Sequence, residues 1–246
     1  MSQSPLPWQR GGQGEGFRRT SSDPVNNPSP PAFAARRRGR QSSPPHEAEG
    51  RISPSRSLTL SAVLLAGGES RRMGTDKATF LFRGKPLWQI QLETLRKLRP
   101  KEIFVSARID PPWRCDGILF VADVPPSRGP LSGLAASMNQ MSTSHLLALA
   151  IDMPWMGNKY LKTLCAQIEP GCGLLPKIGH RAEPLAAIYP REAAIETEKA
   201  LAGTDFSLQS LACDLVAVGK LQAIPVIKQD QKLFRNINEL SDLQSP

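Results

Sequence analysis

The residues of this chain that are best suited to chemistry lie between Leu65 and Lys77, in the string Leu-Ala-Gly-Gly-Glu-Ser-Arg-Arg-Met-Gly-Thr-Asp-Lys. Glycines allow a backbone to approach a ligand closely and leave N–H groups that can point at phosphate oxygens. Arg71, Arg72 and Lys77 add positive charge to the same segment. No Gly-Lys-Ser/Thr follows and the glycine spacing differs from Gly-x-Gly-x-x-Gly, so neither common nucleotide motif is present. The string predicts a phosphate-binding loop, with an ordinary glycine-rich turn as the alternative.

Asp152 is the second candidate, because it directly follows the continuous apolar run Leu146–Ile151. A charged residue at the carboxyl end of a buried strand is placed to meet a ligand. Its carboxylate suits Mg²⁺, which binds through one or two carboxylates together with substrate phosphates. The alternative is that Asp152 caps a helix that begins beyond Pro154.

The cysteines and histidines exclude several other chemistries. The chain has four cysteines and three histidines, at Cys115, Cys165, Cys172, Cys213, His46, His145 and His180. No Cys-x-x-Cys pair occurs, which excludes a zinc ribbon or a disulfide scaffold and is typical of a reducing compartment. No run approaches eighteen apolar residues, and the N-terminus lacks the apolar centre of a secretory signal. We therefore expect a cytoplasmic protein without a membrane partner.

Alternating strands and helices must position these residues. Short apolar runs predict strands at Leu60–Ala66, Glu102–Ser106, Ile118–Ala122, Leu146–Ile151, Gly173–Pro176 and Pro184–Tyr189. Helical spacing predicts helices from Pro86 to Leu98 and over Leu131–Met141, Asn158–Ile168 and Arg191–Leu201. This alternation is typical of a three-layer α/β/α fold with a mostly parallel sheet, in which ligands bind at the carboxyl ends of the strands.

Residues 1–57 differ in composition from the rest of the chain. They contain nine of the 23 prolines, ten serines, and nine arginines against four acidic residues, so +5 of the total charge of +9 lies here. With few aliphatic side chains, this segment cannot offset the entropy of ordering, and we expect a disordered tail before a domain at 58–246. The cluster Arg36–Arg40 could contact a polyanion, although a solvated tail without a partner is the simpler reading. A true start near Ser57 is a further alternative.

Five blocks in order along the chain resemble the MobA-type nucleotidyltransferases, the molybdenum cofactor guanylyltransferases. They are Leu65–Lys77, Gly84–Gln89, Asp123 with Gly129–Gly133, Ala150–Pro154 and Arg235–Asn238. The resemblance covers about Leu60 to Leu243 and implies a Rossmann-like nucleotidyltransferase domain. It implies transfer of GMP from GTP to the terminal phosphate of molybdopterin, with Mg²⁺ present and pyrophosphate released. The product would be the guanine dinucleotide form of the molybdenum cofactor.

The resemblance also assigns roles to individual residues. It places the nucleotide against Leu65, Ala66, Gly67, Gly68, Lys77, Ser106, Asp123 and Asp152. It gives catalytic roles to Lys77, Asp152 and Arg72 and the metal to Asp152, and it places the pterin near Arg181, Asn236 and Asn238. Helix capping is an alternative role for Asn238. Because a phosphomonoester attacker is already anionic near pH 7, no strong general base is required.

Two positions bear on the choice of base. Ser106 stands where the family has an asparagine, and a single hydroxyl cannot replace an amide that both donates and accepts. This departure weakens the case for guanine. Gly67 favours guanylyl transfer, because cytidylyl enzymes of the superfamily usually have alanine in its place.

Three functions follow as hypotheses. The first is a guanylyltransferase with GTP and molybdopterin as substrates, which would hand its product to molybdoenzyme apoproteins or to other cofactor-biosynthesis proteins. The second is a molybdopterin cytidylyltransferase or another nucleotidyltransferase, such as a sugar-phosphate enzyme. The third, from a different class, is an inactive scaffold that binds polyanions through its basic tail. The chain lacks recognisable RNA- or DNA-binding motifs, so we expect no nucleic-acid partner.

Overall fold

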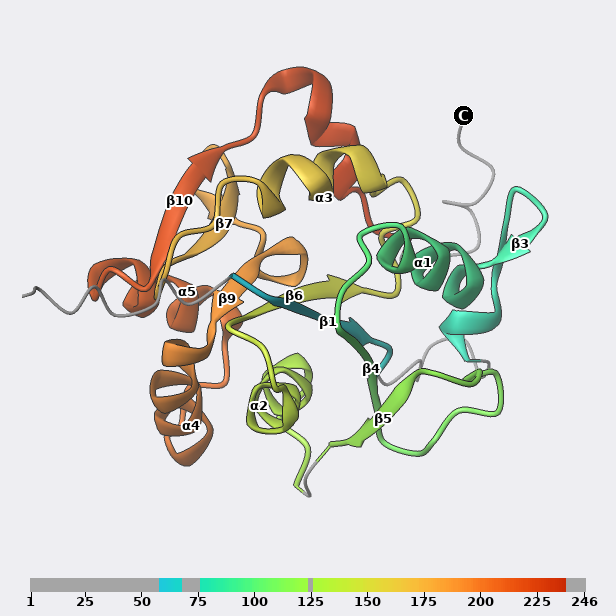
Figure 1. Ribbon diagram of the computed structural model, residues 1–246, viewed down its shortest axis with the longest axis horizontal. Coiled ribbons are helices and arrows are strands. Elements are labelled where there is room, and N and C mark those ends of the chain that lie inside the picture. The colour runs from blue at the N-terminus through green and yellow to red at the C-terminus, as the bar shows by residue number, and fades with distance from the viewer. Residues whose placement is uncertain (1–57, 68–75, 124–125, 238–246) are drawn as a thin grey trace, which may run out of the picture. The chain divides into compact units, whose positions relative to one another are not determined.

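The computed structural model describes residues 58–67, 76–123 and 126–237 (Figure 1). The expectations for residues 1–57 and for Gly68, Arg71, Arg72 and Asn238 lie outside these ranges. No helix within the described ranges is long and apolar enough to cross a membrane.

An eight-stranded, mostly parallel sheet forms the middle of the described domain, with the order β10-β7-β9-β6-β1-β4-β5 and with β8 paired to β7. Antiparallel pairing is confined to β9 with its two neighbours and to β8. The strands are β1 (Leu60–Leu65), β4 (Glu102–Ala107), β5 (Leu119–Ala122), β6 (His145–Ala150), β7 (Gly173–Ile178), β8 (Arg181–Ala182), β9 (Ile188–Pro190) and β10 (Leu221–Pro225). A separate hairpin consists of β2 (Leu81–Phe82) and β3 (Lys85–Pro86).

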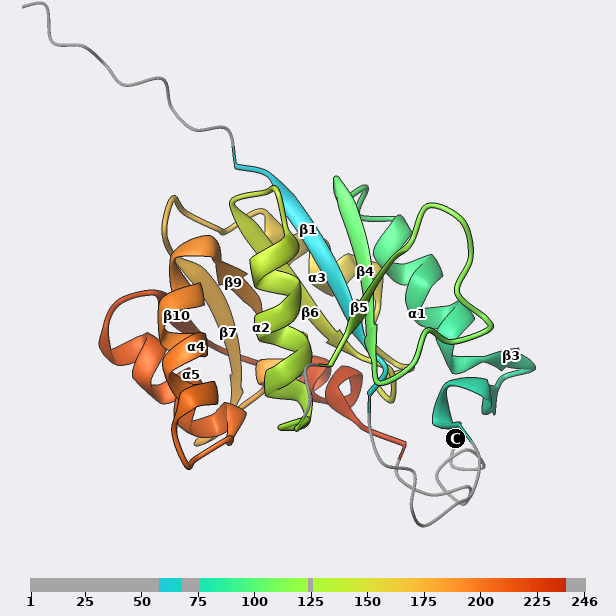
Figure 2. The ribbon, with the colours of Figure 1, turned by 90° about the horizontal axis from the view of Figure 1, so that it is seen from below.

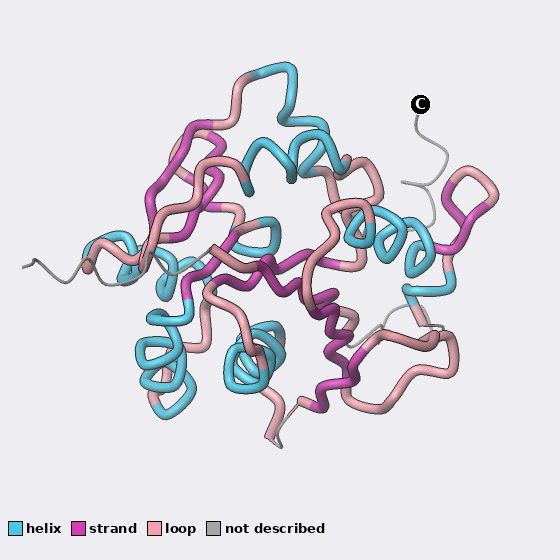
Figure 3. The backbone as a smooth tube through the Cα atoms, viewed as in Figure 1, coloured by secondary structure: helices cyan, strands magenta, loops and turns pink. Residues whose placement is uncertain are grey.

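Helices cover both faces of this sheet, as Figures 1 and 3 show. Helices α1 (Leu87–Arg96) and α3 (Asn158–Cys165) lie on one face, and α2 (Pro130–Gln140), α4 (Ala194–Ala202) and α5 (Leu208–Ala217) lie on the other. Strand β1 explains why both faces need a cover. Its Ala62 and Leu64 pack on the α1 side, whereas Val63 and Leu65 pack on the α2 side. The predicted three-layer α/β/α fold is confirmed.

Local sequence sets where several helices begin. Pro86 has an extended backbone and immediately precedes α1, whose Leu87, Leu92 and Leu95 are buried against the sheet. Ser207 caps α5, because its hydroxyl accepts hydrogen bonds from the backbone N–H groups of the first turn.

The structure differs from the sequence expectations mainly in the second half of the domain. The segment Pro184–Tyr189 is not one strand: a 3₁₀ turn, η2 (Pro184–Ala186), precedes β9, since the Ala186 N–H donates back to the Glu183 carbonyl at 3.1 Å. Helix α5, strand β10 and the 3₁₀ helix η4 (Lys228–Phe234) were not anticipated. The predicted helix at Arg191–Leu201 is a 3₁₀ turn, η3 (Arg191–Ala193), followed by α4.

Candidate active site

Three neighbouring strands end at the same level and bring the candidate residues to one edge of the sheet. In the register of β1 with its two parallel neighbours, Leu65 lies opposite Ser106 of β4 and opposite Ala150 of β6. Figure 2 shows β1 and β6 running toward this edge. The loop after Leu65 and the loop that carries Asp152 therefore start side by side, as expected for a ligand site in a parallel sheet.

Lys77 and Asp152 form an ion pair across this edge. The Lys77 Nζ lies 2.9 Å from Asp152 Oδ2, and the two side chains are 21% and 20% exposed. Lys77 begins a short 3₁₀ helix, η1 (Lys77–Thr79), whose start is capped by Asp76 Oδ1 accepting from the Ala78 N–H at 2.9 Å. Trp113 Nε1 donates to the other Asp76 oxygen at 3.1 Å. Two of the predicted catalytic residues are thus in contact, and Asp76 and Trp113, which sequence reasoning missed, support one of them.

Asp152 retains one unused oxygen. Its Oδ1 is buried and has no hydrogen-bond partner among the described residues, and the same holds for Asn236 Oδ1. The Ile237 N–H donates to the Asp152 carbonyl at 2.8 Å, so the segment that carries Asn236 lies against Asp152. Both unused atoms are acceptors, and each would be satisfied by a cation or by an N–H donor. Asp152 does not cap the next helix, since α3 begins after Gly157.

These oxygens fit Mg²⁺, which takes hard oxygen ligands and shares its coordination with waters and substrate phosphates. No group of three or more His, Cys, Asp and Glu side chains that could hold a metal occurs in the described ranges. These protein oxygens therefore suit an ion whose coordination is completed by the phosphates of a nucleotide. They do not suit an ion that is bound by protein atoms alone. Asp152 is the carboxylate that would hold it.

Asp123 is held rigidly at the end of β5. Its side chain accepts from Ser106 Oγ at 2.9 Å and from Ser127 Oγ at 3.1 Å, and the residue is only 8% exposed. A Cβ at Gly67 would lie 3.1 Å from Asp123 Oδ2, so the glycine makes room for the carboxylate. Asp123 and the start of the glycine-rich segment are therefore packed against each other.

Ser106 occupies a different place from the one expected of a base-contacting residue. It is 1% exposed, and helix α2 lies so close that a Cβ at Gly133 would collide with the Ser106 hydroxyl. Its hydroxyl is used by Asp123. Ser106 thus contacts Asp123, whereas the sequence had suggested direct contact with the nucleotide.

The backbone of Leu65, Ala66 and Gly67 is largely committed to the sheet. The N–H groups of Ala66 and Gly67 both donate to the Ser106 carbonyl, at 2.9 and 3.1 Å, and the Leu65 carbonyl accepts from Ile151 at 3.1 Å. N–H groups able to cradle a phosphate must therefore come from residues after Gly67. Those residues, Gly68 included, fall outside the described ranges.

The residues predicted for the pterin are spread along the edge. Asn236 lies beside Asp152, whereas Arg181 is on β8, which pairs with β7; in the strand order β9 stands between β7 and β6. Arg181 is 73% exposed on its side chain, and its Nε lies 3.7 Å from Glu183 Oε1. Burial raises the pKa of the Glu183 carboxyl, and the Arg181 guanidinium opposes this rise. Most of the Arg181 side chain is thus open to solvent, and its recorded contact is with Glu183.

A parallel sheet with a glycine-rich loop, a lysine and a carboxylate at its carboxyl edge defines an α/β protein of the nucleotide-binding class. A sequence model of the MobA-like NTP transferase domain matches residues 62–217, and the chain belongs to this nucleotidyltransferase family. The match ends at Ala217, the last residue of α5, so β10 and η4 lie beyond it.

Relatives and solved structures agree with this placement. The chain is 30% identical over 186 residues to a "Probable molybdenum cofactor guanylyltransferase" of Opitutus terrae, covering 74% of this chain and 92% of the relative. It is 30% identical over 190 residues to the "Molybdenum cofactor guanylyltransferase" of Syntrophotalea carbinolica, covering 75% and 89%. The crystal structure of molybdopterin-guanine dinucleotide biosynthesis protein A from Archaeoglobus fulgidus has a TM-score of 0.60 at 24% identity, covering 75% of this chain and 95% of that one.

Proposed function

We propose that the protein transfers GMP from GTP to the terminal phosphate of molybdopterin and releases pyrophosphate. The observation that carries the proposal is the Lys77–Asp152 pair, in which Asp152 keeps a buried, unpartnered oxygen at the carboxyl edge of the sheet. Family membership supports nucleotidyl transfer, and the names of relatives at about 30% identity support guanylyl transfer to this acceptor.

The residues of the site suit a reaction governed by charge and position. Asp152 would hold Mg²⁺ through Oδ1, and the ion would neutralise charge on the nucleotide phosphates. Lys77, already beside Asp152, would follow the negative charge that builds on the leaving pyrophosphate. The attacking phosphate needs no proton removed near pH 7, so no nucleophile–base pair is required of the protein. Arg72 is expected to assist as a second cation.

Gly67 supports the choice of guanine, and Asp123 supports nucleotide binding. The carboxylate of Asp123 is fixed by two serine hydroxyls and lies so near Gly67 that an alanine there would crowd it. A fixed carboxylate acceptor suits a ligand that offers N–H or O–H donors, as ribose and the amino groups of guanine and cytosine do. Cytidylyl transfer is therefore the second candidate, and Ser106 bears on the base only through the Asp123 carboxylate that it positions.

Side-by-side thermal stabilisation by GTP, CTP, ATP and UTP, each with Mg²⁺, tests the choice of base. At a nucleotide concentration about a hundred times Kd, ligand binding adds about 2.7 kcal/mol to stability, so a real preference is easily seen. We expect GTP to raise the melting temperature most and to support pyrophosphate release when molybdopterin is supplied. A clear preference for CTP would refute guanylyl transfer while leaving nucleotidyl transfer intact.

A further inference from the structure

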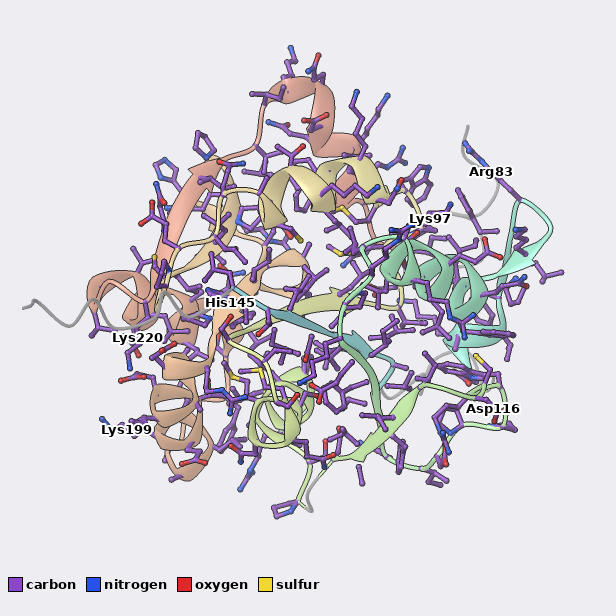
Figure 4. All side chains as sticks on the ribbon, in the orientation of Figure 1. Arg83, Lys97, Asp116, His145, Lys199 and Lys220 are labelled. Atoms are coloured by element: carbon purple, nitrogen blue, oxygen red, sulfur yellow. The ribbon has the colours of Figure 1, made fainter. Side chains whose placement is uncertain are left out.

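The loop between β4 and β5, residues 108–118, reaches the start of the turn that carries Lys77, although the mechanism above uses none of its residues. Figure 4 labels Asp116 of this loop, on the side of the domain where α1 lies. Trp113 Nε1 donates to Asp76 Oδ2 at 3.1 Å, and Asp76 directly precedes Lys77. A tryptophan 37 positions farther along the chain therefore contacts the residue next to the proposed phosphate-binding lysine.

Asp76 fixes how the turn with Lys77 begins. Its Oδ1 accepts from the Ala78 N–H at 2.9 Å, and its backbone carbonyl accepts from the Thr79 N–H at 3.0 Å and from the Thr79 hydroxyl at 2.8 Å. The turn η1 is only three residues long, and hydrogen bonds in 3₁₀ helices have poor geometry, so its shape depends strongly on this cap. The direction in which the Lys77 side chain leaves the backbone is therefore set by Asp76 on one side and by the buried Ala78 on the other.

The Trp113 side chain is itself held in place. Its ring stacks on that of Trp88 in α1, with centroids 5.6 Å apart and planes 12° from parallel. The next residue, Arg114, donates to the Ile118 carbonyl at 2.8 Å, and its Nε and Nη2 donate to the Asp110 carboxylate at 2.7 and 2.6 Å. The loop is thus closed on itself and stacked on a helix of the domain, so the indole N–H has a defined position.

These contacts form a continuous path from α1 to the Lys77–Asp152 pair. Trp113 joins Trp88 of α1 to Asp76. Asp76 begins the turn of Lys77, whose Nζ lies 2.9 Å from Asp152 Oδ2. Lysine has a flexible four-carbon stem, so the place of its ammonium is defined only as well as its backbone and its partners are. Since electrostatic stabilisation of a transition state needs charges that are in place before the reaction, a donor that fixes Asp76 affects the reaction through Lys77.

We propose that Trp113 is a positioning residue for the nucleotidyl transfer: its indole N–H, acting through Asp76, holds the Lys77 ammonium where negative charge develops on the leaving pyrophosphate. Trp113 itself contacts no reacting atom in this assignment. The proposal rests on the proposed function, because it adds a residue to the machinery of that reaction. It depends on the hydrogen-bond donor of Trp113 and not on the size of its ring, and the test separates these two properties.

Two replacements of Trp113 separate its hydrogen bond from its packing. Trp113→Phe keeps an aromatic ring and removes the donor, whereas Trp113→His keeps a ring N–H and loses more of the packing area. Trp88→Phe is the matched control, since it removes an indole from the same stacked pair and leaves the donor to Asp76 in place. The kcat and KM of pyrophosphate release are measured for each variant at about pH 8, where imidazole is mostly neutral.

A structural role and a positioning role predict opposite orders for the two replacements. If Trp113 only packs, the larger phenylalanine ring should preserve both the melting temperature and the rate better than histidine does. For a positioning role we expect W113F to lower kcat about fivefold or more, and W113H and W88F to stay within about twofold of the wild type. The KM for molybdopterin should change by less than about twofold in all three variants, because the acceptor does not meet Lys77.

Two further measurements ask whether the effect passes through Lys77. Adding Trp113→Phe to Lys77→Met should change the residual rate by less than about twofold, because residues that act through one group are not additive. Inorganic pyrophosphate with Mg²⁺, titrated calorimetrically, should bind about fivefold more weakly to W113F than to the wild type. The same substitution should leave pyrophosphate binding unchanged when Lys77 is already methionine.

The proposal is overturned if W113F reacts and binds pyrophosphate like the wild type, or if W113H or W88F is as slow as W113F. It is also overturned if W113F slows the Lys77→Met enzyme as much as it slows the wild type. If the wild type transfers no GMP and the pyrophosphate affinities still follow the expected pattern, the proposed function is refuted and the link from Trp113 to Lys77 stands.

Discussion

Two ion pairs of nearly equal burial have very different surroundings. The Lys77–Asp152 pair is 2.9 Å long with side chains 21% and 20% exposed, and the Lys220–Glu196 pair is 2.6 Å long with side chains 22% and 19% exposed. Lys220 also donates to the Glu192 carbonyl at 2.6 Å and joins β10 to α4, which is a structural role. Asp152 instead has a buried oxygen without a partner in the described part of the chain.

The difference shows that an ion pair alone does not mark a site. Buried polar atoms are nearly always hydrogen-bonded, so an exception needs a reason, and a ligand is one such reason. The comparison predicts that the two pairs respond oppositely to mutation: the Lys77–Asp152 pair should matter for activity, and the Lys220–Glu196 pair for stability.

The largest expected effect is a loss of activity in the Lys77→Met variant, with Lys220→Met as the control. Removing the Lys77 charge should lower the rate of GTP-dependent pyrophosphate release by about a hundredfold or more, because charge on the leaving group is no longer met. Lys220→Met should lower the melting temperature and leave the rate of the folded enzyme close to that of the wild type. If both variants had comparable rates in a steady-state assay, the two ion pairs could not be told apart as catalytic and structural.

Glu196→Gln should have a smaller effect, confined to stability and dependent on pH. The hydrogen bond from Lys220 is the main factor that lowers the pKa of Glu196 below its ordinary value of 4.5. A carboxyl with a lowered folded-state pKa stabilises the fold above that ordinary value, and the contribution is lost as the pH falls below it. Urea unfolding should therefore show the wild type more stable than the variant by about 1 kcal/mol near pH 7, with the gap closing below pH 4.5. A gap that widens on acidification would contradict this account of the pair.

The smallest effect concerns an unpartnered side chain away from the edge. Gln91 of α1 is fully buried, and neither its amide nitrogen nor its amide oxygen has a partner within the ranges that the structure describes. Gln91→Met keeps the shape and removes the unmet polar groups, so it should add about 1 kcal/mol and raise the melting temperature by about 2–4 °C. Calorimetry on the two proteins measures this directly. Destabilisation would mean that the Gln91 amide is hydrogen-bonded in solution. Buried atoms without a partner in the structure would then be poor evidence for a ligand site in this protein.

The sequence predicted the central half of the fold well because the signals there are local. Runs such as Leu60–Leu65 are buried on both faces and therefore almost wholly apolar, and Asp152 stands out directly after one of them. Strand β10 and helix α5 were missed, since β10 is a short edge strand with only partly buried residues in its middle.

Features of the site that depend on packing between distant segments could not be predicted. Ser106 donates to Asp123, and α2 approaches Ser106 closely at Gly133; no local pattern reveals either contact. Asn236 is brought next to Asp152 by a backbone hydrogen bond that its neighbour Ile237 donates to the Asp152 carbonyl, and the two segments are far apart in the sequence.

The central claim is that Asp152 binds the metal. The most direct test measures Mg²⁺-dependent pyrophosphate release from GTP and molybdopterin by the Asp152→Asn and Glu196→Gln variants in the same assay. Both substitutions remove one negative charge from ion pairs of matched burial. We predict a loss of about a hundredfold or more for Asp152→Asn, because the metal loses the negative charge of its carboxylate ligand, and a change within about twofold for Glu196→Gln. Wild-type activity in Asp152→Asn, or an equal loss in both variants, would contradict the assignment of Asp152 to the metal.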